Sequence, residues 1–180
     1  ILIPTIATLF MAFIRMAIAL RQAQTLGEEK VLARTDELTG LANRRRLIAE
    51  LSSLEEGVLL LMDLDGFKPI NDQYGHDVGD KVLQRVAERF SRAMPDGSLL
   101  ARLGGDEFGA IVPGSSESAL ELALALRATL SYPLTVGGEN ISLGVSIGCA
   151  TSDGTDTLLK RADAAMYEAK RSGAGISTAE

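Results

Sequence analysis

Tryptophan is absent from this 180-residue sequence, and cysteine and histidine occur once each, as Cys149 and His76. A single cysteine cannot form an intrachain disulfide, so the sequence predicts a protein of a reducing cytosol. One histidine excludes a histidine-rich metal site. Basic residues are also few: 18 stand against 24 acidic ones, for a net charge of −6. This balance argues against nucleic acid and favours a small-molecule partner, whose negative charge would need a metal or local cations.

The N-terminal residues are the one long hydrophobic run. Residues 1–20 are apolar except for two threonines and Arg15. A bilayer span needs roughly 20 apolar residues, and Arg15 and Arg21 suit a cytoplasmic exit. We therefore expect residues 1–22 to end a transmembrane segment that anchors a longer protein to the inner membrane. The alternative, which Arg15 keeps open, is a soluble helix that buries one face against a dimer partner or another domain.

The rest of the chain predicts a connecting helix over 23–35 and one globular domain over 36–180. Its apolar periodicities indicate helices over 43–54, 77–94, 116–130 and 156–173, strands over 57–65 and 140–150, and a hairpin over 99–112. This order contains a β-α-β-β-α-β core of the ferredoxin-like kind. The expected fold class is α+β, with a largely antiparallel central sheet flanked by helices.

Acidic side chains gather where two of these strands end. Asp63 and Asp65 close the buried strand on one face, and the hairpin tip "RLGGDEFGA" carries Asp106 and Glu107. In a split βαβ sheet the hairpin lies beside the first strand, so these carboxylates would share one site. Unpaired charges there would be costly, and a hard divalent cation such as Mg²⁺ would neutralise them while leaving positions open for phosphate.

Two further segments carry polar side chains that could face a ligand. A glycine-punctuated loop is expected over 66–80, with the candidates Lys68, Asn71, Asp72, His76, Asp77 and Asp80. The last helix places Lys160, Asp163, Tyr167 and Lys170 on one polar face. Each feature alone has a structural interpretation, such as a solvated turn acid, a surface lysine or a carboxylate at a helix N-terminus. Their occurrence together, in this order, favours a functional site.

Five segments carry a resemblance to the GGDEF-domain diguanylate cyclases over residues 36–172. They are "DELTGLANRR" (36–45), "DLDGFKPINDQYGHDVGD" (63–80), "ARLGGDEF" (101–108), "VSIGCA" (145–150) and "RADAAMYEAK" (161–170). The resemblance implies a palm-like sheet related to that of nucleotide cyclases. It also implies condensation of two GTP molecules into cyclic dimeric GMP (cyclic di-GMP) with release of pyrophosphate, in a homodimer.

The resemblance also implies roles for single residues. Asp63, the Leu64 carbonyl, Asp106 and Glu107 match the positions that hold Mg²⁺, with Mn²⁺ as an alternative ion. Asp106 and Glu107 match the catalytic positions, and Asp106 matches the proton acceptor. The positions that match substrate-binding residues are Phe67, Lys68 and Lys170 at the triphosphate, Asn71 and Asp80 at the guanine, and His76. A carboxylate at Asp80 suits guanine because the Watson–Crick edge of that base offers two adjacent donors.

Two departures from the family pattern are present. The R-x-x-D product site is replaced by "PDGS" at 95–98, so feedback inhibition through that site is expected to be absent. Ala174 stands where the family has a phosphate-contacting arginine, a change that could reduce GTP affinity or turnover, and Arg171 is the candidate substitute. The alternative to an active cyclase is therefore a catalytically weak module that binds GTP or cyclic di-GMP as a receptor.

Overall fold

The computed structural model describes residues 15–16, 34–154 and 157–179. Contacts within the chain separate Asp36–Glu180 as a compact unit. The expected apolar helix over 1–22 and connecting helix over 23–35 lie almost wholly outside the described residues, and the described Arg34 and Thr35 are not helical. Among the residues that are described, no helix has both the length and the hydropathy of a membrane span.

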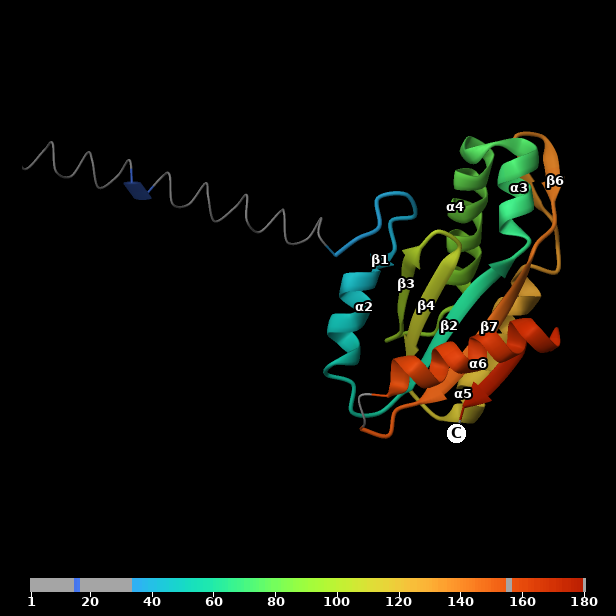
Figure 1. Ribbon diagram of the computed structural model, residues 1–180. Helices are drawn as coiled ribbons and strands as arrows, with labels where there is room; N and C mark the ends of the chain where they lie inside the picture. The colour runs from blue at the N-terminus through green and yellow to red at the C-terminus, as the bar shows by residue number, and fades with distance from the viewer. Residues whose placement is uncertain (1–14, 17–33, 155–156, 180) are drawn as a thin grey trace, which may run out of the picture. The chain divides into compact units, whose positions relative to one another are not determined.

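A six-stranded sheet forms the centre of the unit (Figure 1). Its strands are β1 (Ala42–Asn43), β2 (Val58–Asp65), β3 (Leu99–Gly104), β4 (Glu107–Val112), β7 (Gly144–Thr151) and β8 (Ile176–Ala179). They lie in the order β1-β3-β4-β2-β7-β8. The four inner strands are antiparallel, and the edge strands β1 and β8 pair in parallel. The predicted α+β class with a largely antiparallel sheet is confirmed.

Helices cover both faces of the sheet. Figure 1 shows α2 (Arg44–Leu51) and α6 (Leu158–Ser172) on one face, and α3 (Phe67–Tyr74), α4 (His76–Ala93) and α5 (Ser116–Thr129) pack on the other. In β2, Leu60 and Met62 belong to the α4 side, whereas Leu59 and Leu61 belong to the α6 side. Burial on both faces explains why β2 is continuously apolar from Val58 to Met62, before Asp63 and Asp65 at its end.

The α4 side of the core sets the position of β4. Val82, Val86 and Phe90 repeat at helical spacing along α4 and are fully buried. The Phe90 ring meets the Phe108 ring edge-to-face, with centroids 5.7 Å apart, a favoured aromatic geometry. The residue that follows Glu107 is thereby fixed in the core. Cys149 is buried nearby in the same cluster, and burial raises the pKa of its thiol to about 11, so it is an unreactive core side chain.

Several elements differ from the sequence expectations. The expected loop over 66–80 is instead α3 followed directly by α4, and Pro69 fits because it lies in the first helical turn, where its missing N–H costs nothing. Gly66 and Gly75 have φ of 81° and 85°, which lets the chain turn into and out of α3. Ile48 of α2 is a large apolar side chain that remains 41% exposed.

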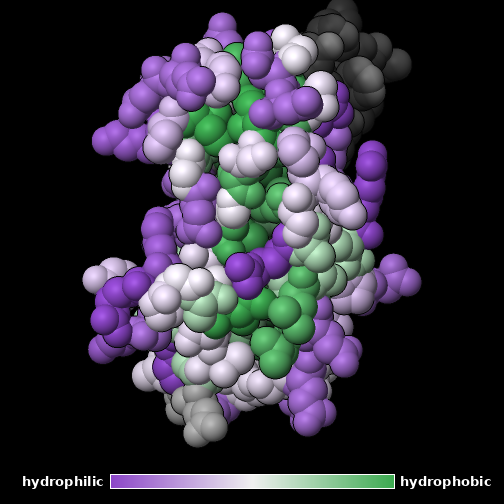
Figure 2. Space-filling view, turned by 90° about the vertical axis from the view of Figure 1, so that its right-hand side faces the viewer, coloured by the Kyte–Doolittle hydropathy of each residue, from purple (hydrophilic) through white to green (hydrophobic). Residues whose placement is uncertain are grey.

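Short strands outside the main pattern were also missed by the sequence analysis. They are β1, β8 and the separate ribbon formed by β5 (Leu134–Val136) and β6 (Glu139–Ile141). Figure 2 shows a band of hydrophobic residues with hydrophilic ones on both sides, on the face of the domain that it presents. Apolar side chains thus remain at the surface as well as in the core. The large exposed ones include Leu120 and Leu124 of α5.

Candidate active site

The acidic residues of β2 and of the hairpin tip lie side by side. β2 and β4 are adjacent antiparallel strands, and their register places Asp63 opposite Glu107. The Leu64 amide donates a hydrogen bond to the backbone carbonyl of Asp106 at 3.2 Å. The prediction that the hairpin tip meets the end of β2 is confirmed. Asp63 and Asp106 are half-buried, whereas Glu107 is exposed.

The hairpin tip is held by an arginine that the sequence analysis did not single out. Arg102 precedes an irregularity in the β3–β4 pairing, and its guanidinium donates to the Gly105 carbonyl at 2.9 and 3.1 Å. Gly104 and Gly105 have φ of 138° and 54°, a backbone that other residues rarely adopt. Only the isolated positive charge two residues before Gly104 could have signalled this role.

Arg102 is itself held by Asp36, the first residue of the compact unit. Its guanidinium lies 3.0 Å from the Asp36 carboxylate, and the two side chains are only 13% and 19% exposed. The same carboxylate accepts hydrogen bonds from the Thr39 amide and hydroxyl at 2.9 and 2.6 Å. Burial pushes the pKa of Asp36 upward, but these hydrogen bonds and the Arg102 charge outweigh it and hold the pKa below its ordinary value.

Lys170 of α6 contacts the acidic edge, defined as the end of β2 and the hairpin tip that carry Asp63, Asp65, Asp106 and Glu107. Its Nζ donates to Asp63 Oδ1 at 2.6 Å. This hydrogen bond raises the pKa of Lys170; partial burial opposes the rise, and the charges of Asp63, Asp106 and Asp65 add to it. Asp65 in turn accepts a hydrogen bond from the buried Ser146 hydroxyl at 2.9 Å. A cation therefore already lies at this edge, where the local charge is negative.

The donor atoms at this edge fit a hard divalent ion. The carboxylates of Asp63 and Glu107 and the backbone oxygen of Leu64 are oxygen ligands, which Mg²⁺ and Mn²⁺ prefer. The ammonium bound to Asp63 shows that a positive charge is stabilised there. In the part of the chain that the structure describes, no three histidine, cysteine or acidic side chains are gathered closely enough to hold a metal.

Apart from Lys170 of α6, the predicted nucleotide-binding residues lie on two adjoining helices. α3 begins two residues after Asp65 and packs against α4. Asn71 of α3 has a buried Oδ1 with no hydrogen-bond partner, which is costly unless a ligand satisfies it. Gly79 of α4 leaves room for this amide, because a Cβ there would collide with Asn71 Oδ1. Asp80 follows on α4 and is exposed.

The remaining predicted positions near these helices differ in exposure. Phe67 is 7% exposed at the start of α3 and packs into the core, so its side chain is not available to a ligand. Lys68 is exposed in the first turn of α3, and His76 is exposed at the start of α4. Asp72 and Asp77 are also exposed. The structure brings none of these four side chains into a contact that would assign it a role.

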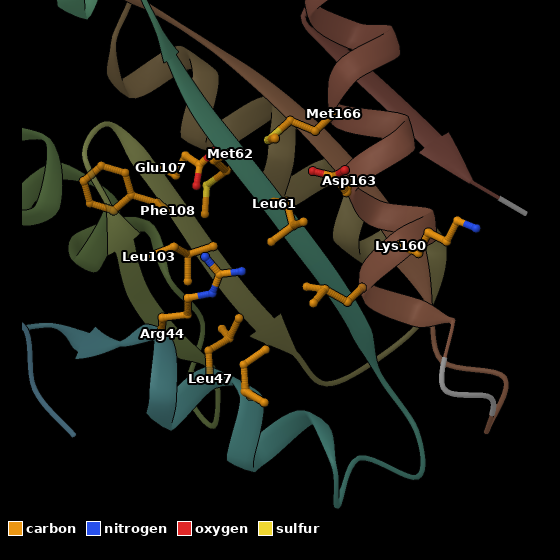
Figure 3. A pocket seen from close by; sticks show the side chains of 12 residues that line it. Arg44, Leu47, Leu61, Met62, Leu103, Glu107, Phe108, Lys160, Asp163 and Met166 are labelled. Atoms are coloured by element: carbon orange, nitrogen blue, oxygen red, sulfur yellow. The ribbon is translucent and has the colours of Figure 1, made fainter. Parts of the chain in front are cut away.

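A pocket of about 450 Å³ opens between α2 and α6, over β2 and β4 (Figure 3). Its apolar lining includes Leu47 of α2, Leu61 of β2 and Met166 of α6. Arg44, Lys160, Asp163 and Glu107 also line it. Glu107 therefore borders both the pocket and the acidic edge. The expected polar face of the last helix is confirmed as exposed, and two of its members line this pocket.

The end of α6 is relevant to the missing family arginine. Arg171 is paired with Glu168 at 2.9 Å, one turn earlier on the same helix. The backbone carbonyl of Ala174 accepts a hydrogen bond from Arg127 of α5 at 3.2 Å. A Cβ on Gly175 would collide with that Arg127 guanidinium, so this arginine lies close against the loop. In this arrangement neither arginine contacts the acidic edge, and Lys170 is the cation that does.

Known proteins resemble this chain over most of its length. The family described as "Diguanylate cyclase, GGDEF domain" matches residues 33–175. The response regulator PleD of Caulobacter vibrioides is 42% identical over 158 residues, which are 79% of this chain and 35% of PleD. The chain thus spans about a third of that relative's length.

Solved structures agree with this match. The GGDEF domain of TpbB from Pseudomonas aeruginosa is 36% identical with a TM-score of 0.77, covering 81% of this chain and 94% of that one. The coiled coil and GGDEF domain of DgcB from Caulobacter crescentus, solved with c-di-GMP, is 31% identical with a TM-score of 0.82, covering 91% and 95%. With its acidic hairpin beside β2 and its family match over 33–175, the chain belongs to the GGDEF domain family.

Proposed function

We propose that this domain is a diguanylate cyclase, which condenses two GTP molecules into cyclic di-GMP and releases two pyrophosphates. The observation that carries the proposal is the register that sets Asp63 opposite Glu107. It brings together acids from the end of β2 and the start of β4, close in sequence to the start of α3, and so supports a metal and phosphate site there. Among relatives, PleD and DgcB support the family, and c-di-GMP is bound in the DgcB structure.

Asp63, Glu107 and the Leu64 carbonyl would hold the divalent ion, with Asp106 beside them. When bound, Mg²⁺ or Mn²⁺ would stabilise the negative charge that develops on the transferred phosphate and on the leaving pyrophosphate. Lys170 and Lys68 would add positive charge near the phosphates. In this role the acids hold the divalent ion that positions the phosphates, and the ion and the two lysines balance the negative charge of the acids.

Asn71 and Asp80 would bind the guanine. The buried and unpaired Asn71 Oδ1 supports this role, because a base donor would satisfy it. The exposed Asp80 carboxylate can accept two hydrogen bonds from the N1 and N2 donors of guanine. Adenine lacks this donor pair and would leave the carboxylate unpaired, which disfavours it.

In the reaction, the 3′-oxygen of one GTP bonds to the α-phosphorus of the other, and the bond from that phosphorus to the β-phosphate bridge breaks. A carboxylate oxygen of Asp106 accepts the proton of the attacking hydroxyl. A second attack, by the 3′-oxygen of the other nucleotide on the α-phosphorus of the first, closes the ring and releases the second pyrophosphate. Since one domain holds one GTP, two domains must face each other, and we propose a homodimer. We also propose that the domain works in the cytoplasm and that residues 1–22 anchor it.

The test is turnover of GTP by the full chain with Mg²⁺, followed by pyrophosphate release and by detection of cyclic di-GMP. Asp106→Ala should abolish turnover and leave the unfolding temperature nearly unchanged, because Asp106 lies in the hairpin turn between β3 and β4. Asp96→Ala, at an exposed position after α4, is the matched control and should retain activity. Full turnover by Asp106→Ala would show that the site is wrongly assigned.

A second candidate function is a receptor that binds GTP or cyclic di-GMP without turnover. Two observations favour it: Ala174 replaces the family arginine, and Arg171 is paired with Glu168 rather than turned to the site. A receptor would bind GTP in calorimetry while releasing no pyrophosphate, under conditions in which the protein is dimeric. Release of pyrophosphate at a rate above that of Asp106→Ala would exclude this function.

A further inference from the structure

The contact between Lys170 and Asp63 joins two distant parts of the sequence at the acidic edge. It is 2.6 Å long and links residues 107 positions apart, from α6 and β2. The Asp63 side chain is 15% exposed, whereas Lys170 is 51% exposed. The carboxylate is thus fixed within the sheet, and the lysine is the member of the pair that can leave into solvent.

This pair differs from the Arg171–Glu168 ion pair at the same end of α6. Arg171 and Glu168 are both exposed neighbours one turn apart, an arrangement that contributes little energy. Lys170 instead bonds a residue of the sheet, and the charges of Asp106 and Asp65 also attract its ammonium. The ammonium therefore neutralises the edge that would otherwise hold several negative charges near one another.

A divalent ion would need the same carboxylate. A lysine ammonium and a metal ion cannot both lie within bonding distance of Asp63 Oδ1 without strong repulsion between them, because like charges a few ångströms apart repel. The second carboxylate oxygen of Asp63 is not bound to Lys170, but a metal ion there would still lie within a few ångströms of the ammonium, so each cation weakens the binding of the other. Metal binding therefore favours movement of Lys170 away from Asp63, and the phosphates of a nucleotide offer it another anionic partner.

We propose that Lys170 is a resident counter-ion that occupies Asp63 while the site is free of metal and competes with the divalent ion for it. This inference rests on the proposed function, since it assumes the metal site at Asp63. It explains how the acidic edge folds without metal, and it makes metal and nucleotide bind together: the triphosphate draws Lys170 off Asp63 as the ion arrives. Lys170 is in this respect a positioning residue for the metal.

The test measures binding of Mn²⁺ alone to the full chain, by electron paramagnetic resonance of the free ion. Lys170→Met removes the competing charge and should tighten Mn²⁺ binding by about tenfold, the size expected for one like charge at a partly exposed site. Lys170→Arg keeps the charge and should stay within about twofold of the wild type. Arg171→Met, which removes the neighbouring charge paired with Glu168, is the matched control and should also stay within about twofold. Thermal unfolding of each variant verifies that it is folded.

The outcomes separate this inference from the proposed function. Equal or weaker Mn²⁺ binding by Lys170→Met overturns the inference, and so does equal tightening by Arg171→Met, which would indicate general electrostatics. The same titrations are repeated with 3′-deoxy-GTP, which has the triphosphate but lacks the attacking hydroxyl. One outcome is that the wild type binds Mn²⁺ in the presence of 3′-deoxy-GTP, while Lys170→Met binds Mn²⁺ alone no more tightly than the wild type does. In that case the inference fails and the metal site stands. If no variant binds Mn²⁺ under either condition, both fail.

Discussion

The ion pair between Asp36 and Arg102 should be essential to the hairpin that carries the acids. In Asp36→Asn the side chain keeps its shape and an oxygen that can accept from Thr39, but it loses its charge. Arg102 then remains largely buried without a counter-ion, at a side-chain exposure of 13%. Hydrogen bonds to charged groups are worth about 1.5–3 kcal/mol, so we expect the free energy of unfolding to fall by about 2 kcal/mol at pH 7.

The pH dependence follows from the lowered pKa of Asp36. A carboxyl with a lower pKa in the folded than in the unfolded state stabilises the fold above its unfolded pKa of about 3.9. This contribution is lost as the pH falls from that value through the folded-state pKa. The asparagine variant has no such group. The stability difference between the two proteins should therefore be full at pH 6–7 and shrink steadily below about pH 4.

The assay is urea unfolding of the full chain and of Asp36→Asn at a series of pH values from 7 to 3. For a domain of this size, a loss of about 2 kcal/mol corresponds to a fall of about 6 °C in Tm. Asp96→Asn, at an exposed position, is the control and should match the wild type within about 0.5 kcal/mol. A difference below about 0.5 kcal/mol at pH 7, or one that stays constant down to pH 3, would refute the reasoning.

Three further predictions concern the nucleotide site, the helix packing and product control. Gly79→Ala should displace the Asn71 amide, because the new Cβ collides with its Oδ1. The KM for GTP in a steady-state assay should rise, with little change in Tm. An unchanged KM would argue against a role of Asn71. Gly148→Ala should lower the free energy of unfolding by about 3 kcal/mol or more in urea, since its Cβ meets the α6 backbone at Met166, which cannot yield as a side chain can. Cyclic di-GMP added to the reaction should not inhibit through 95–98, so substitution of that segment should leave the progress curve unchanged; inhibition that disappears with the substitution would contradict this.

The main elements could be predicted because their burial leaves a period in the sequence. β2 lies in the middle of the sheet with helices on both faces, so its apolar run has no polar break until Asp63. α4 shows buried residues at helical spacing from Val82 to Phe90. These patterns arise from the two-sided and one-sided burial of the elements themselves, and no knowledge of partners was needed.

α3 could not be predicted from such a pattern. It has only eight residues, and it lies between Gly66 and Gly75 with Pro69 inside. These residue types mark turns in most sequences, but here they begin and end a short helix whose two buried residues give too little periodicity. The edge strands are similar: β1 and β8 have two and four residues, and their pairing depends on a sheet formed by distant segments.

The same distinction applies to the site: the meeting of the acids could be predicted from the order of the elements, whereas the cations that pair with acids could not. The meeting of Asp63 with Glu107 followed from the neighbourhood of a hairpin and a strand, which the order of elements implies. The counter-charges did not follow, because Arg102 meets Asp36 across 66 positions and Lys170 meets Asp63 across 107. Neither pairing has a local signal.

These counter-charges explain how a hairpin tip with two adjacent carboxylates is stable. Arg102 fixes the turn through the Gly105 carbonyl, and Lys170 neutralises the facing strand. The two cations differ in freedom, since Arg102 is 13% exposed and bound on two sides, whereas Lys170 is 51% exposed and bound on one. Arg102 therefore keeps the acids in place at all times, and Lys170 is the cation that a metal and a triphosphate can displace.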